Sequence, residues 1–588
     1  MIKVENLSYS FPEKDLYKKV SFSIEEGQHV ALIGSNGTGK TTLIDMFLND
    51  DEYLYTGKIQ KKENLKFGYV SQYVSHDKNV SVNVYEYLCQ DFLDMLKEQE
   101  EICVEMETAT DFDEIMERYQ KSLDAFAAVD GDNYETNVKK QLKLAGLEQI
   151  AEVSVADISG GEYKLIQIIR QMMRFPGILI MDEPDVFLDF DNLAGLRNLI
   201  CSYPATILVI THNRYLLNHC FNKILHLENA DIQEFEGTYM DYQVALLGKK
   251  VELQEGAAKD QAEIERNEKL VNRLRKEATY IDNSGKGRQL KARASLLERL
   301  KAKAIKAPFV EVREPDIHLF KTVVEENVDT LEESHLEPSG ALLKVDDYEL
   351  AFDEVLLQNV SFEIGPHDKV ALVGANGTGK TTLLRDIYEA HKDEMKIGYM
   401  SQIYGNLYGE KDTVFSAFEQ IGFDTRKQVK EYLMKYCFCE DISDQLISVL
   451  SGGERNLMQL AILNQTKEDL LLLDEPTSHL DTYAQIALEK AIKEFPGAVL
   501  MVSHDFYTIV NCVDYVLFVD DKSIRKMSNR AFRKMIYKEH FSSQYMELEK
   551  EKAELEQKIN LHLRKYEYEK AKTLCEQLET VVGKMSAL

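Results

Sequence analysis

The fold of this chain is decided by one stretch, Gly34-Ser35-Asn36-Gly37-Thr38-Gly39-Lys40-Thr41-Thr42, which follows a short β-rich run and precedes an apolar helical stretch. Its glycines let backbone N–H groups curl around phosphate oxygens, and Lys40 can reach the β- and γ-phosphates. Thr41 can ligate Mg²⁺ while the following helix presents its N-terminus. This strand-loop-helix context predicts a nucleotide site on an α/β core.

The same stretch returns 340 residues later as Gly374-Ala375-Asn376-Gly377-Thr378-Gly379-Lys380-Thr381-Thr382. Further elements recur in the same order, and from the Ser-Gly-Gly-Glu element onward their offset is a constant 292 residues. The repeat predicts two similar domains, each with its own nucleotide site. The matching elements are Gln72 and Gln402, Ser159-Gly160-Gly161-Glu162 and Ser451-Gly452-Gly453-Glu454, Ile178–Glu183 and Leu470–Glu475, and Thr211-His212 and Ser503-His504.

These motifs resemble those of the ATP-binding cassette family, and the resemblance covers both halves, about four fifths of the chain. It implies an α/β fold with two cassette domains, each a parallel-strand P-loop core with a helical subdomain. It also implies that the cassettes close head to tail, so that each ATP lies between one P-loop and the other cassette's signature Ser-Gly-Gly. The implied cofactors are ATP and Mg²⁺, and the implied reaction is hydrolysis of ATP to ADP and phosphate.

The resemblance assigns a role to each repeated residue. An apolar strand ending in Asp-Glu delivers the Asp to the Mg²⁺ shell and the Glu to polarise the attacking water. The glutamine senses metal and water, and the histidine holds the γ-phosphate and supports the developing charge. Phe11 and Phe352 could stack on adenine, although such an aromatic is as often part of a core. The candidate catalytic residues are Glu183, Glu475, His212, His504, Gln72 and Gln402, and the candidate metal ligands are Thr41, Asp182, Gln72, Thr381, Asp474 and Gln402.

Between the two halves lies a basic segment, Lys269 to Lys306, with twelve Lys and Arg against three acids. Its net charge is +9, whereas the whole chain carries −30, so the remainder carries about −39. Apolar residues at helical spacing on both sides of Asn283–Gly287 predict a helical hairpin with its tip there. A polyanion would bind this segment in preference to the acidic body. A solvated coiled-coil spacer is the alternative reading.

Two further segments distinguish the chain. The first half has 48 more residues than the second between the P-loop lysine and the signature serine, which predicts an inserted helical arm at about 85–140. Residues 539–588 are helical by pattern, either as a solvated coiled coil or as a partner-binding extension. The predicted domains are 1–240 (first cassette), 241–312 (hairpin linker), 313–340 (connecting segment), 341–532 (second cassette) and 533–588 (C-terminal helical extension).

Twin cassettes, an arm in the first and a basic helical linker together resemble the ABC-F subfamily. The resemblance implies ribosome binding near the exit-tRNA site, with the linker extending toward the P-site tRNA and the peptidyl transferase centre. A hairpin arm of about 30 residues would reach about 45 Å. Some relatives assist translation and others dislodge ribosome-targeting antibiotics, and both roles stay open here. The candidate RNA contacts are Lys286, Arg288, Lys291 and Arg293.

The first cassette departs from the usual run of the family after its catalytic pair. It reads Asp185-Val186-Phe187, whereas the second cassette reads Thr477-Ser478-His479 at the matching positions. These residues shape the loop that contacts the opposite cassette, so we expect two competent but unequal sites. An ATP-binding scaffold would be expected to lack Glu183 or Glu475, and both are present.

Composition sets the remaining expectations. The 588 residues are 44% hydrophobic and 29% charged, which is typical of globular domains. No apolar run approaches about 18 residues, so we expect a cytoplasmic protein. The resemblance implies a monomer that binds ribosomal RNA and tRNA, with neither DNA nor a membrane partner. The eight cysteines are scattered and are expected to be reduced. The alternative function is the soluble ATPase subunit of a membrane transporter; a DNA-repair ATPase would normally carry zinc knuckles or very long coiled coils.

Overall fold

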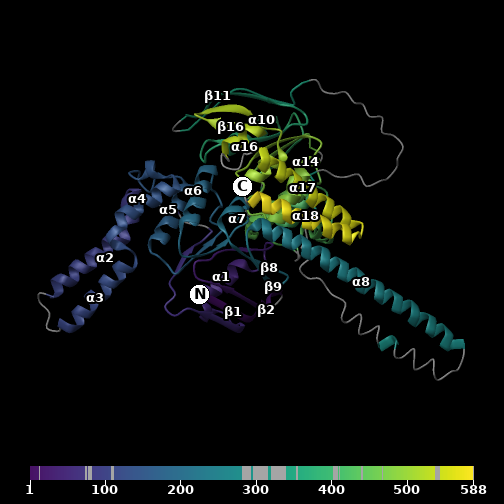
Figure 1. The fold of residues 1–588 in the computed structure, drawn as a ribbon. Coiled ribbons are helices and arrows are strands. Elements are labelled where there is room, and N and C mark those ends of the chain that lie inside the picture. Colours follow the sequence, from purple (N-terminus) through teal and green to yellow (C-terminus); the bar gives the residue numbers. More distant parts are fainter. Residues whose placement is uncertain are drawn as a thin grey trace. The chain divides into compact units, whose positions relative to one another are not determined.

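The computed structural model describes residues 1–11, 14–72, 76, 82–106, 112–280, 293–295, 315–319, 340–352, 355–401, 408–409, 411–438, 442–466, 468–536 and 543–586. The chain divides into two compact units: residues Met1–Glu234 with Glu314–Ile536, and residues Phe235–Arg313 with Tyr537–Leu588. The first unit contains both cassettes, and the second contains the linker and the C-terminal helices (Figure 1). No helix within the described ranges is long and apolar enough to cross a membrane.

The first cassette is built on a six-stranded sheet in the order β5-β6-β7-β3-β8-β9. Strands β5, β6, β7, β3 and β8 are parallel neighbours. β6 and β7 are buried along their whole length, as is typical of parallel strands covered on both faces. Its strands are β3 (His29–Ile33), β5 (Phe67–Val70), β6 (Ile178–Asp182), β7 (Thr206–Ile210), β8 (Lys223–Glu228) and β9 (Asp231–Glu236), and a smaller antiparallel sheet holds β2 (Lys14–Ile24), β1 (Ile2–Phe11) and β4 (Thr56–Lys61).

The helices of the first cassette follow the expected order. α1 begins at the end of the P-loop, and α5 begins at the signature serine, whose side chain and that of Glu162 form a capping box. The predicted arm at about 85–140 falls on α2, α3 and the first half of α4, and α2 packs along α3 (Figure 1). The helices are α1 (Lys40–Leu48), α2 (Val84–Met106), α3 (Phe112–Ala128), α4 (Tyr134–Ala145), α5 (Gly160–Met173), α6 (Phe190–Ser202) and α7 (Arg214–Cys220).

The second cassette repeats this design with the sheet order β13-β14-β15-β12-β16-β17, in which only β17 is antiparallel to its neighbour. The structure therefore confirms the predicted α/β fold with two P-loop cassettes. The strands are β10 (Leu343–Ala351), β11 (Val355–Ile364), β12 (Lys369–Val373), β13 (Ile397–Met400), β14 (Leu470–Asp474), β15 (Ala498–Val502), β16 (Tyr515–Asp520) and β17 (Ser523–Ser528). The helices are α10 (Lys380–His391), α11 (Val414–Glu419), α12 (Arg426–Leu433), α13 (Gly452–Leu463), α14 (Thr482–Glu494), α15 (Phe506–Cys512) and α16 (Asn529–Ile536).

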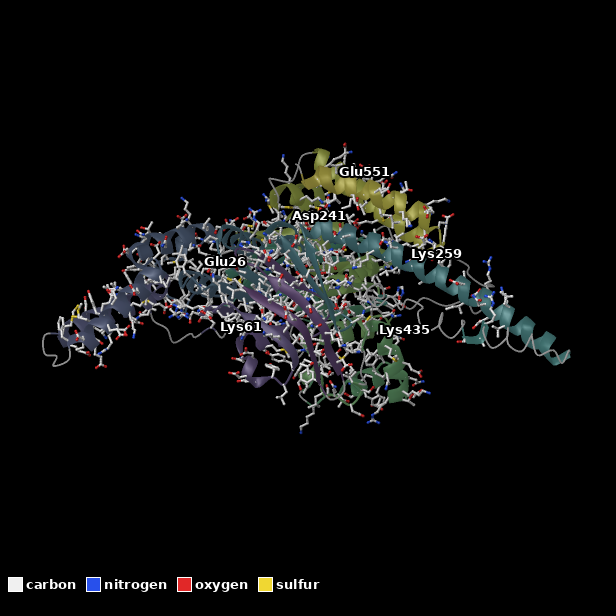
Figure 2. All side chains as sticks on the ribbon, turned by 60° about the horizontal axis from the view of Figure 1, so that its bottom comes forward. Glu26, Lys61, Asp241, Lys259, Lys435 and Glu551 are labelled. Atoms are coloured by element: carbon white, nitrogen blue, oxygen red, sulfur yellow. The ribbon has the colours of Figure 1, made fainter. Side chains whose placement is uncertain are left out.

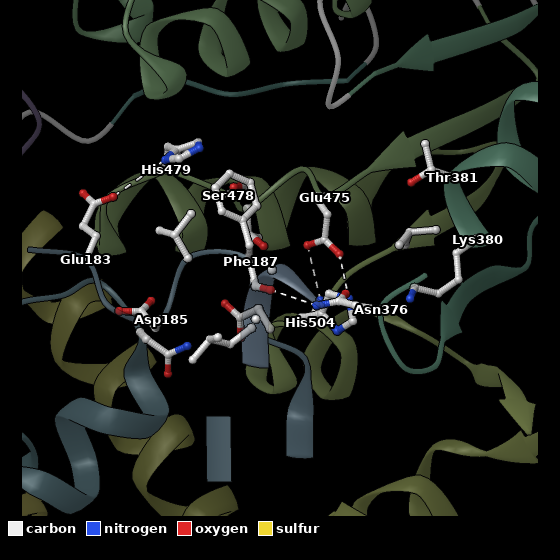
Figure 3. A pocket seen from close by; sticks show the side chains of 18 of the residues that line it. Glu183, Asp185, Phe187, Asn376, Lys380, Thr381, Glu475, Ser478, His479 and His504 are labelled. Atoms are coloured by element: carbon white, nitrogen blue, oxygen red, sulfur yellow. Dashed lines mark hydrogen bonds and ion pairs between the residues drawn. The ribbon is translucent and has the colours of Figure 1, made fainter. Parts of the chain in front are cut away.

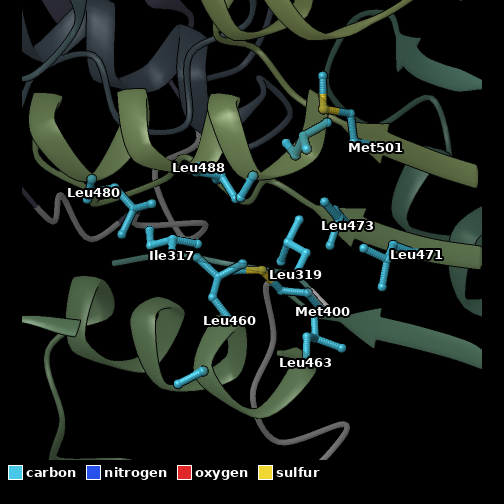
Figure 4. Close-up of a cluster of buried hydrophobic side chains, with 14 of the residues drawn as sticks. Ile317, Leu319, Met400, Leu460, Leu463, Leu471, Leu473, Leu480, Leu488 and Met501 are labelled. Atoms are coloured by element: carbon cyan, nitrogen blue, oxygen red, sulfur yellow. The ribbon is translucent and has the colours of Figure 1, made fainter. Parts of the chain in front are cut away.

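A short segment before the second cassette, residues 315–319, is part of that cassette's core. Ile317 and Leu319 are buried among side chains of β13, β14 and α13, including Met400 (Figure 4). The backbone N–H of Asp316 donates to the carbonyl of Lys435 at 2.9 Å. Burying two large aliphatic side chains is worth about 1.5–3 kcal/mol each, so this segment is firmly attached to the second cassette.

The second unit joins the linker's first arm to the C-terminal extension. α8 (Tyr239–Tyr280) packs on α18 (Tyr568–Ser586), which packs on α17 (Ser543–Arg564). Their shared core includes Val251 of α8 and Ile559 of α17, both fully buried. The charged side chains of Asp241, Lys259 and Glu551 lie on the exposed sides of these helices (Figure 2).

The C-terminal extension is therefore packed within the chain, which differs from the solvated coiled coil considered as one alternative. The apolar stripes that predicted these helices are buried in the core shared with α8, where Leu548, Leu555, Leu578 and Val581 all lie. Lys552 Nζ also donates to Gln243 Oε1 at 2.9 Å. Segments predicted as separate, the linker and the extension, thus share one hydrophobic core.

Candidate active sites

Both P-loops turn from a buried strand into a helix through left-handed glycines. Gly39 and Gly379, the residues that precede α1 and α10, have φ values of 98° and 89°. The positive φ at Gly379 strains any other residue, and a Cβ there would also lie 2.5 Å from Leu350 Cδ2, so glycine is strongly favoured. Lys40 Nζ donates to the carbonyls of Gly34 (2.7 Å) and Ser35 (3.0 Å). Lys380 does the same with Gly374 and Ala375, at 2.9 and 2.7 Å.

Each P-loop threonine lies against the aspartate at the end of the central strand. Thr41 Oγ1 donates to Asp182 Oδ2 at 3.0 Å, and Thr381 Oγ1 donates to Asp474 Oδ1 at 3.1 Å. Hydroxyl and carboxylate oxygens are the ligands that Mg²⁺ prefers, so this donor set fits the ion. Burial raises the pKa of Asp182 to about 6, and a cation beside it would favour the ionised form.

Each candidate site contains residues from both cassettes. The backbone N–H of Asn36 donates to Asp481 Oδ2 (3.2 Å), and its Nδ2 donates to the His479 carbonyl (2.8 Å). Reciprocally, the backbone N–H of Asn376 donates to Asp189 Oδ2 (3.1 Å), and its Nδ2 donates to the Phe187 carbonyl (2.8 Å). The P-loop of each cassette thus faces the loop after the catalytic pair of the other cassette, as the head-to-tail expectation required.

A cavity of about 500 Å³ opens at this interface. It is lined by Asn376, Lys380 and Thr381 of the second P-loop (Figure 3). The first cassette's signature glycines, Gly160 and Gly161, also line it. At the other P-loop, the signature glycine Gly453 lies so close to Asn36 that a Cβ would come within 2.5 Å of its Nδ2. Both signature serines, Ser159 and Ser451, cap the N-terminus of a helix, where the helix dipole favours an anion.

The two catalytic-glutamate candidates have different neighbours. Gln72 Nε2 donates to Glu183 Oε2 at 2.5 Å, and His479 Nδ1 of the opposite cassette lies 3.7 Å from the same oxygen. Burial alone would raise the pKa of Glu183, but the contact with His479 and the nearby positive charge of Lys40 outweigh it, and the net shift is downward.

Glu475 is held within its own cassette. Its carboxylate accepts from the backbone N–H of His504 at 3.4 Å and lies 3.5 Å from His504 Nε2 (Figure 3). Burial, reinforced by Asp474, raises the pKa of Glu475 to about 8. The environments of the two glutamates are therefore unequal.

Both histidine candidates are buried and neutral near pH 7. Burial lowers the pKa of His212 to about 4 and that of His504 to about 3. Among the described residues, neither His212 Nε2 nor His504 Nδ1 has a hydrogen-bond partner. A buried polar atom without a partner is costly, and a bound phosphate oxygen would satisfy it.

The adenine-stacking role of Phe11 and Phe352 stays a prediction. Their side chains are 48% and 67% exposed, and Phe352 is not among the residues that line the cavity at the second P-loop. Arg293, in a short helical piece, donates from Nη1 to Asn267 Oδ1 of α8 at 3.4 Å, which is a long hydrogen bond. Gln402, Lys286, Arg288 and Lys291 lie outside the described residues.

Sequence reasoning missed two buried cations, one beside the first site and one between the cassettes. Lys164 Nζ donates to the carbonyls of Gln72 (2.6 Å) and Glu183 (3.4 Å), so it ties two candidate residues together. Burial lowers the pKa of Lys164 to about 8. The side chain of Arg214, two residues after His212, forms an ion pair with Glu489 of the second cassette. Single charges on otherwise apolar helix faces were the only sequence signal for either residue.

Comparison with known proteins gives a uniform result. Residues 17–186 and 357–478 match the family model described as ABC transporter, and residues 225–319 match a second model of that description. ABC transporter F family member 2 of Arabidopsis thaliana is 29% identical over 582 residues, which cover 95% of this chain and 81% of that relative. The energy-dependent translational throttle protein EttA of Mycobacterium tuberculosis is 27% identical over 539 residues, which cover 86% of this chain and 88% of that relative.

A solved structure shares the fold. The archaeal ribosome recycling factor aABCE1, in complex with the archaeal ribosomal stalk protein aP1, matches over 91% of this chain and 92% of its own chain. The TM-score is 0.53 and the sequence identity is 17%. At that identity, the likeness extends to the twin-cassette architecture alone.

Proposed function

Because the chain belongs to the ABC-F type of ATP-binding cassette proteins, we propose that it is an ATPase that binds the ribosome and acts there through the linker between its cassettes. One observation carries the ATPase part: each P-loop is hydrogen-bonded, through Asn36 or Asn376, to the loop of the opposite cassette. A site divided in this way is complete only when the cassettes are closed, so ATP binding and hydrolysis can drive a cycle of closing and opening.

The residues divide the reaction between them. The P-loop backbone N–H groups and its lysine bind the phosphates, and the signature serine of the opposite cassette contributes a helix N-terminus to the γ-phosphate. The buried aspartate and the P-loop threonine would hold Mg²⁺, which neutralises charge on the β- and γ-phosphates when bound. The glutamate polarises the attacking water, and the neutral histidine donates to the γ-phosphate as charge develops.

The ribosome part rests on the family and on the distribution of charge. One relative is named a translational throttle protein, and the linker is the basic segment of an otherwise acidic chain. Contacts from basic side chains to RNA phosphates release counterions and supply affinity. We propose that the linker extends toward tRNA and the peptidyl transferase centre, as a translation factor or as a protein that protects the ribosome from antibiotics. Either role places the protein in the cytoplasm.

The test is a Glu183→Gln, Glu475→Gln double variant. It should bind ATP, hydrolyse it about 10²-fold more slowly or worse, and co-sediment with ribosomes in ATP because the closed state persists. Glu494→Gln is the matched control, since Glu494 is an exposed glutamate on α14 that pairs with its helix neighbour Lys490. If the double variant hydrolyses ATP at the parent rate, neither glutamate has the catalytic role proposed for it. Recovery with a membrane protein, and not with ribosomes, would favour the ATPase subunit of a transporter.

A further inference from the structure

Positions 187 and 479 are equivalent in the repeat but differ in chemistry, since one is Phe and the other is His. Both have left-handed backbones, with φ values of 68° and 59°. Both accept the same hydrogen bond at 2.8 Å, from the P-loop asparagine of the opposite cassette to the backbone carbonyl. The contact that joins the cassettes is therefore the same at both sites, and only the side chains differ.

The His479 side chain reaches into the site of the first P-loop. Its Nδ1 lies 3.3 Å from Gln72 Nε2 and 3.7 Å from Glu183 Oε2. The side chains of His479 and Glu183 are each only 16% exposed. Gln72 donates to the same glutamate oxygen, so glutamine, glutamate and the opposite cassette's histidine form one cluster.

Phe187 makes no such contribution to the site of the second P-loop. Its side chain has no polar atom, is 49% exposed, and packs edge-on against His479 with ring centroids 6.0 Å apart. Glu475 is instead contacted by His504 of its own cassette. A second aromatic side chain of the first cassette, Phe190, packs edge-on against this histidine, at 5.9 Å between centroids.

From this geometry, and resting on the ATPase function proposed above, we propose that His479 is a positioning residue that orients Glu183 from the opposite cassette. Phe187 leaves the second P-loop's site without an equivalent. A carboxylate that polarises water must be held in one orientation, and small misplacements of a catalytic group are costly in rate. Hydrolysis at the first P-loop therefore depends on the loop of the second cassette, whereas the base at the second P-loop is oriented from within its own cassette.

The substitution that tests this is already accommodated by the fold. Phe occupies the equivalent left-handed position at 187, so His479→Phe introduces no new backbone strain. His479→Asn places an amide where the imidazole Nδ1 lies, and Asn tolerates a left-handed backbone. His391→Phe is the matched control, since His391 lies at the far end of α10 and is paired with Glu394 on the surface.

The full-length protein is assayed for ATP hydrolysis in two backgrounds. Glu475→Gln leaves the first P-loop's site as the main source of turnover, and Glu183→Gln leaves the second. In the first background, His479→Phe should lower kcat about 10-fold or more with KM for ATP within about 2-fold, because positioning and not binding is lost. His479→Asn should restore most of the rate. In the second background, the loss should be at least about 5-fold smaller.

Three results would overturn the inference: an unchanged or raised kcat for His479→Phe in the first background, equal losses in both backgrounds, or a His479→Asn variant as slow as His479→Phe. These outcomes are distinct from failure of the proposed function, which would appear as parent-rate hydrolysis in the double Gln variant. If His391→Phe lowers kcat as much as His479→Phe does, the loss is general and the positioning role is rejected.

Discussion

Arg214 joins the two cassettes through a buried ion pair, and its removal gives a sharp prediction. The guanidinium is paired with Glu489 and lies 3.2 Å from Asp505, and the side chains of Arg214 and Glu489 are both nearly inaccessible. The ring of Tyr507 lies under it at 5.1 Å. These three partners belong to the second cassette, so a side chain of the first cassette supplies the positive charge that neutralises the two carboxylates.

The cost of Arg214→Met follows from what remains buried. Asp505 keeps its two backbone donors at the start of α15, and Glu489 keeps the Thr508 hydroxyl and the Asn511 amide. Removing one partner of a buried pair typically costs about 3–5 kcal/mol, and these residual donors favour the lower end, about 3 kcal/mol. With a urea m-value of about 3 kcal/mol per molar for a unit of this size, the unfolding midpoint should fall by about 1 M.

The measurement is urea unfolding of the full chain, followed by circular dichroism. A multi-domain protein need not unfold in one step, so the midpoint compared is that of the transition which Arg214→Met shifts. Adding Glu489→Gln should recover at least half of the shift, since it removes the stranded charge. Arg197→Met, at the position equivalent to Glu489, is the control, because the contacts of Arg197 with Asn198 stay within the first cassette. A shift below about 0.2 M, or no recovery in the double variant, would refute the assignment.

Three further predictions follow from the sites and the linker. Glu183→Gln and Glu475→Gln alone should give different residual ATPase rates, because the loops at 185–187 and 477–479 differ; equal rates would contradict this. Changing Lys286, Arg288, Lys291 and Arg293 to Gln should weaken ribosome co-sedimentation at moderate salt and leave ribosome-free ATP turnover near the parent value. The slope of log binding constant against log salt concentration should fall by somewhat under 1 for each lost contact. Full ribosome-dependent activity of this variant would mean that the linker is only a spacer. Burial raises the pKa of Asp185 to about 6. The folded protein therefore keeps a proton on Asp185 between about pH 4 and pH 6, where the unfolded chain has released it, and the free energy of unfolding falls as pH rises through this range. Asp185→Asn, which keeps the acceptor for Thr211 Oγ1 (2.7 Å), should therefore raise the urea midpoint at pH 7.5 and have little effect at pH 4, and a lower midpoint at pH 7.5 would contradict the reasoning.

The fold of each cassette was predictable because its signals are local. A run such as 30–42 contains a strand, a left-handed turn and a helix start within 13 residues, and each is fixed by its own residue types. The contact between Thr41 and Asp182, 141 residues apart, was predictable for the same reason, because both residues lie at the same edge of a parallel sheet. Where a motif combines turn chemistry and a strand end, sequence and structure agree.

The packing partners were not predictable in this way. The stripe with Leu548 and Ile559 indicated that α17 needs an apolar partner, but periodicity does not say which helix provides it. α17 packs on α18, and α18 packs on α8, which begins about 300 residues earlier in the chain. Lys164 and Arg214 were missed for a related reason: each is a single charged residue whose role depends on buried carbonyls or carboxylates that come from distant segments.

The unequal sites show how topology can redirect a sequence difference. The departure at 185–187 lies in the first cassette, three residues after Asp182, so a reading by position alone would place its effect on the first P-loop's site. The head-to-tail contacts reverse this, because Phe187 lies against Asn376 of the second P-loop and His479 lies against Asn36 of the first. His479, in the loop that keeps the usual run of the family, therefore acts at the site that contains Lys40 and Glu183. In a twin-cassette chain, substitutions in this loop have to be assigned to the opposite P-loop before any inference about catalysis is drawn from them.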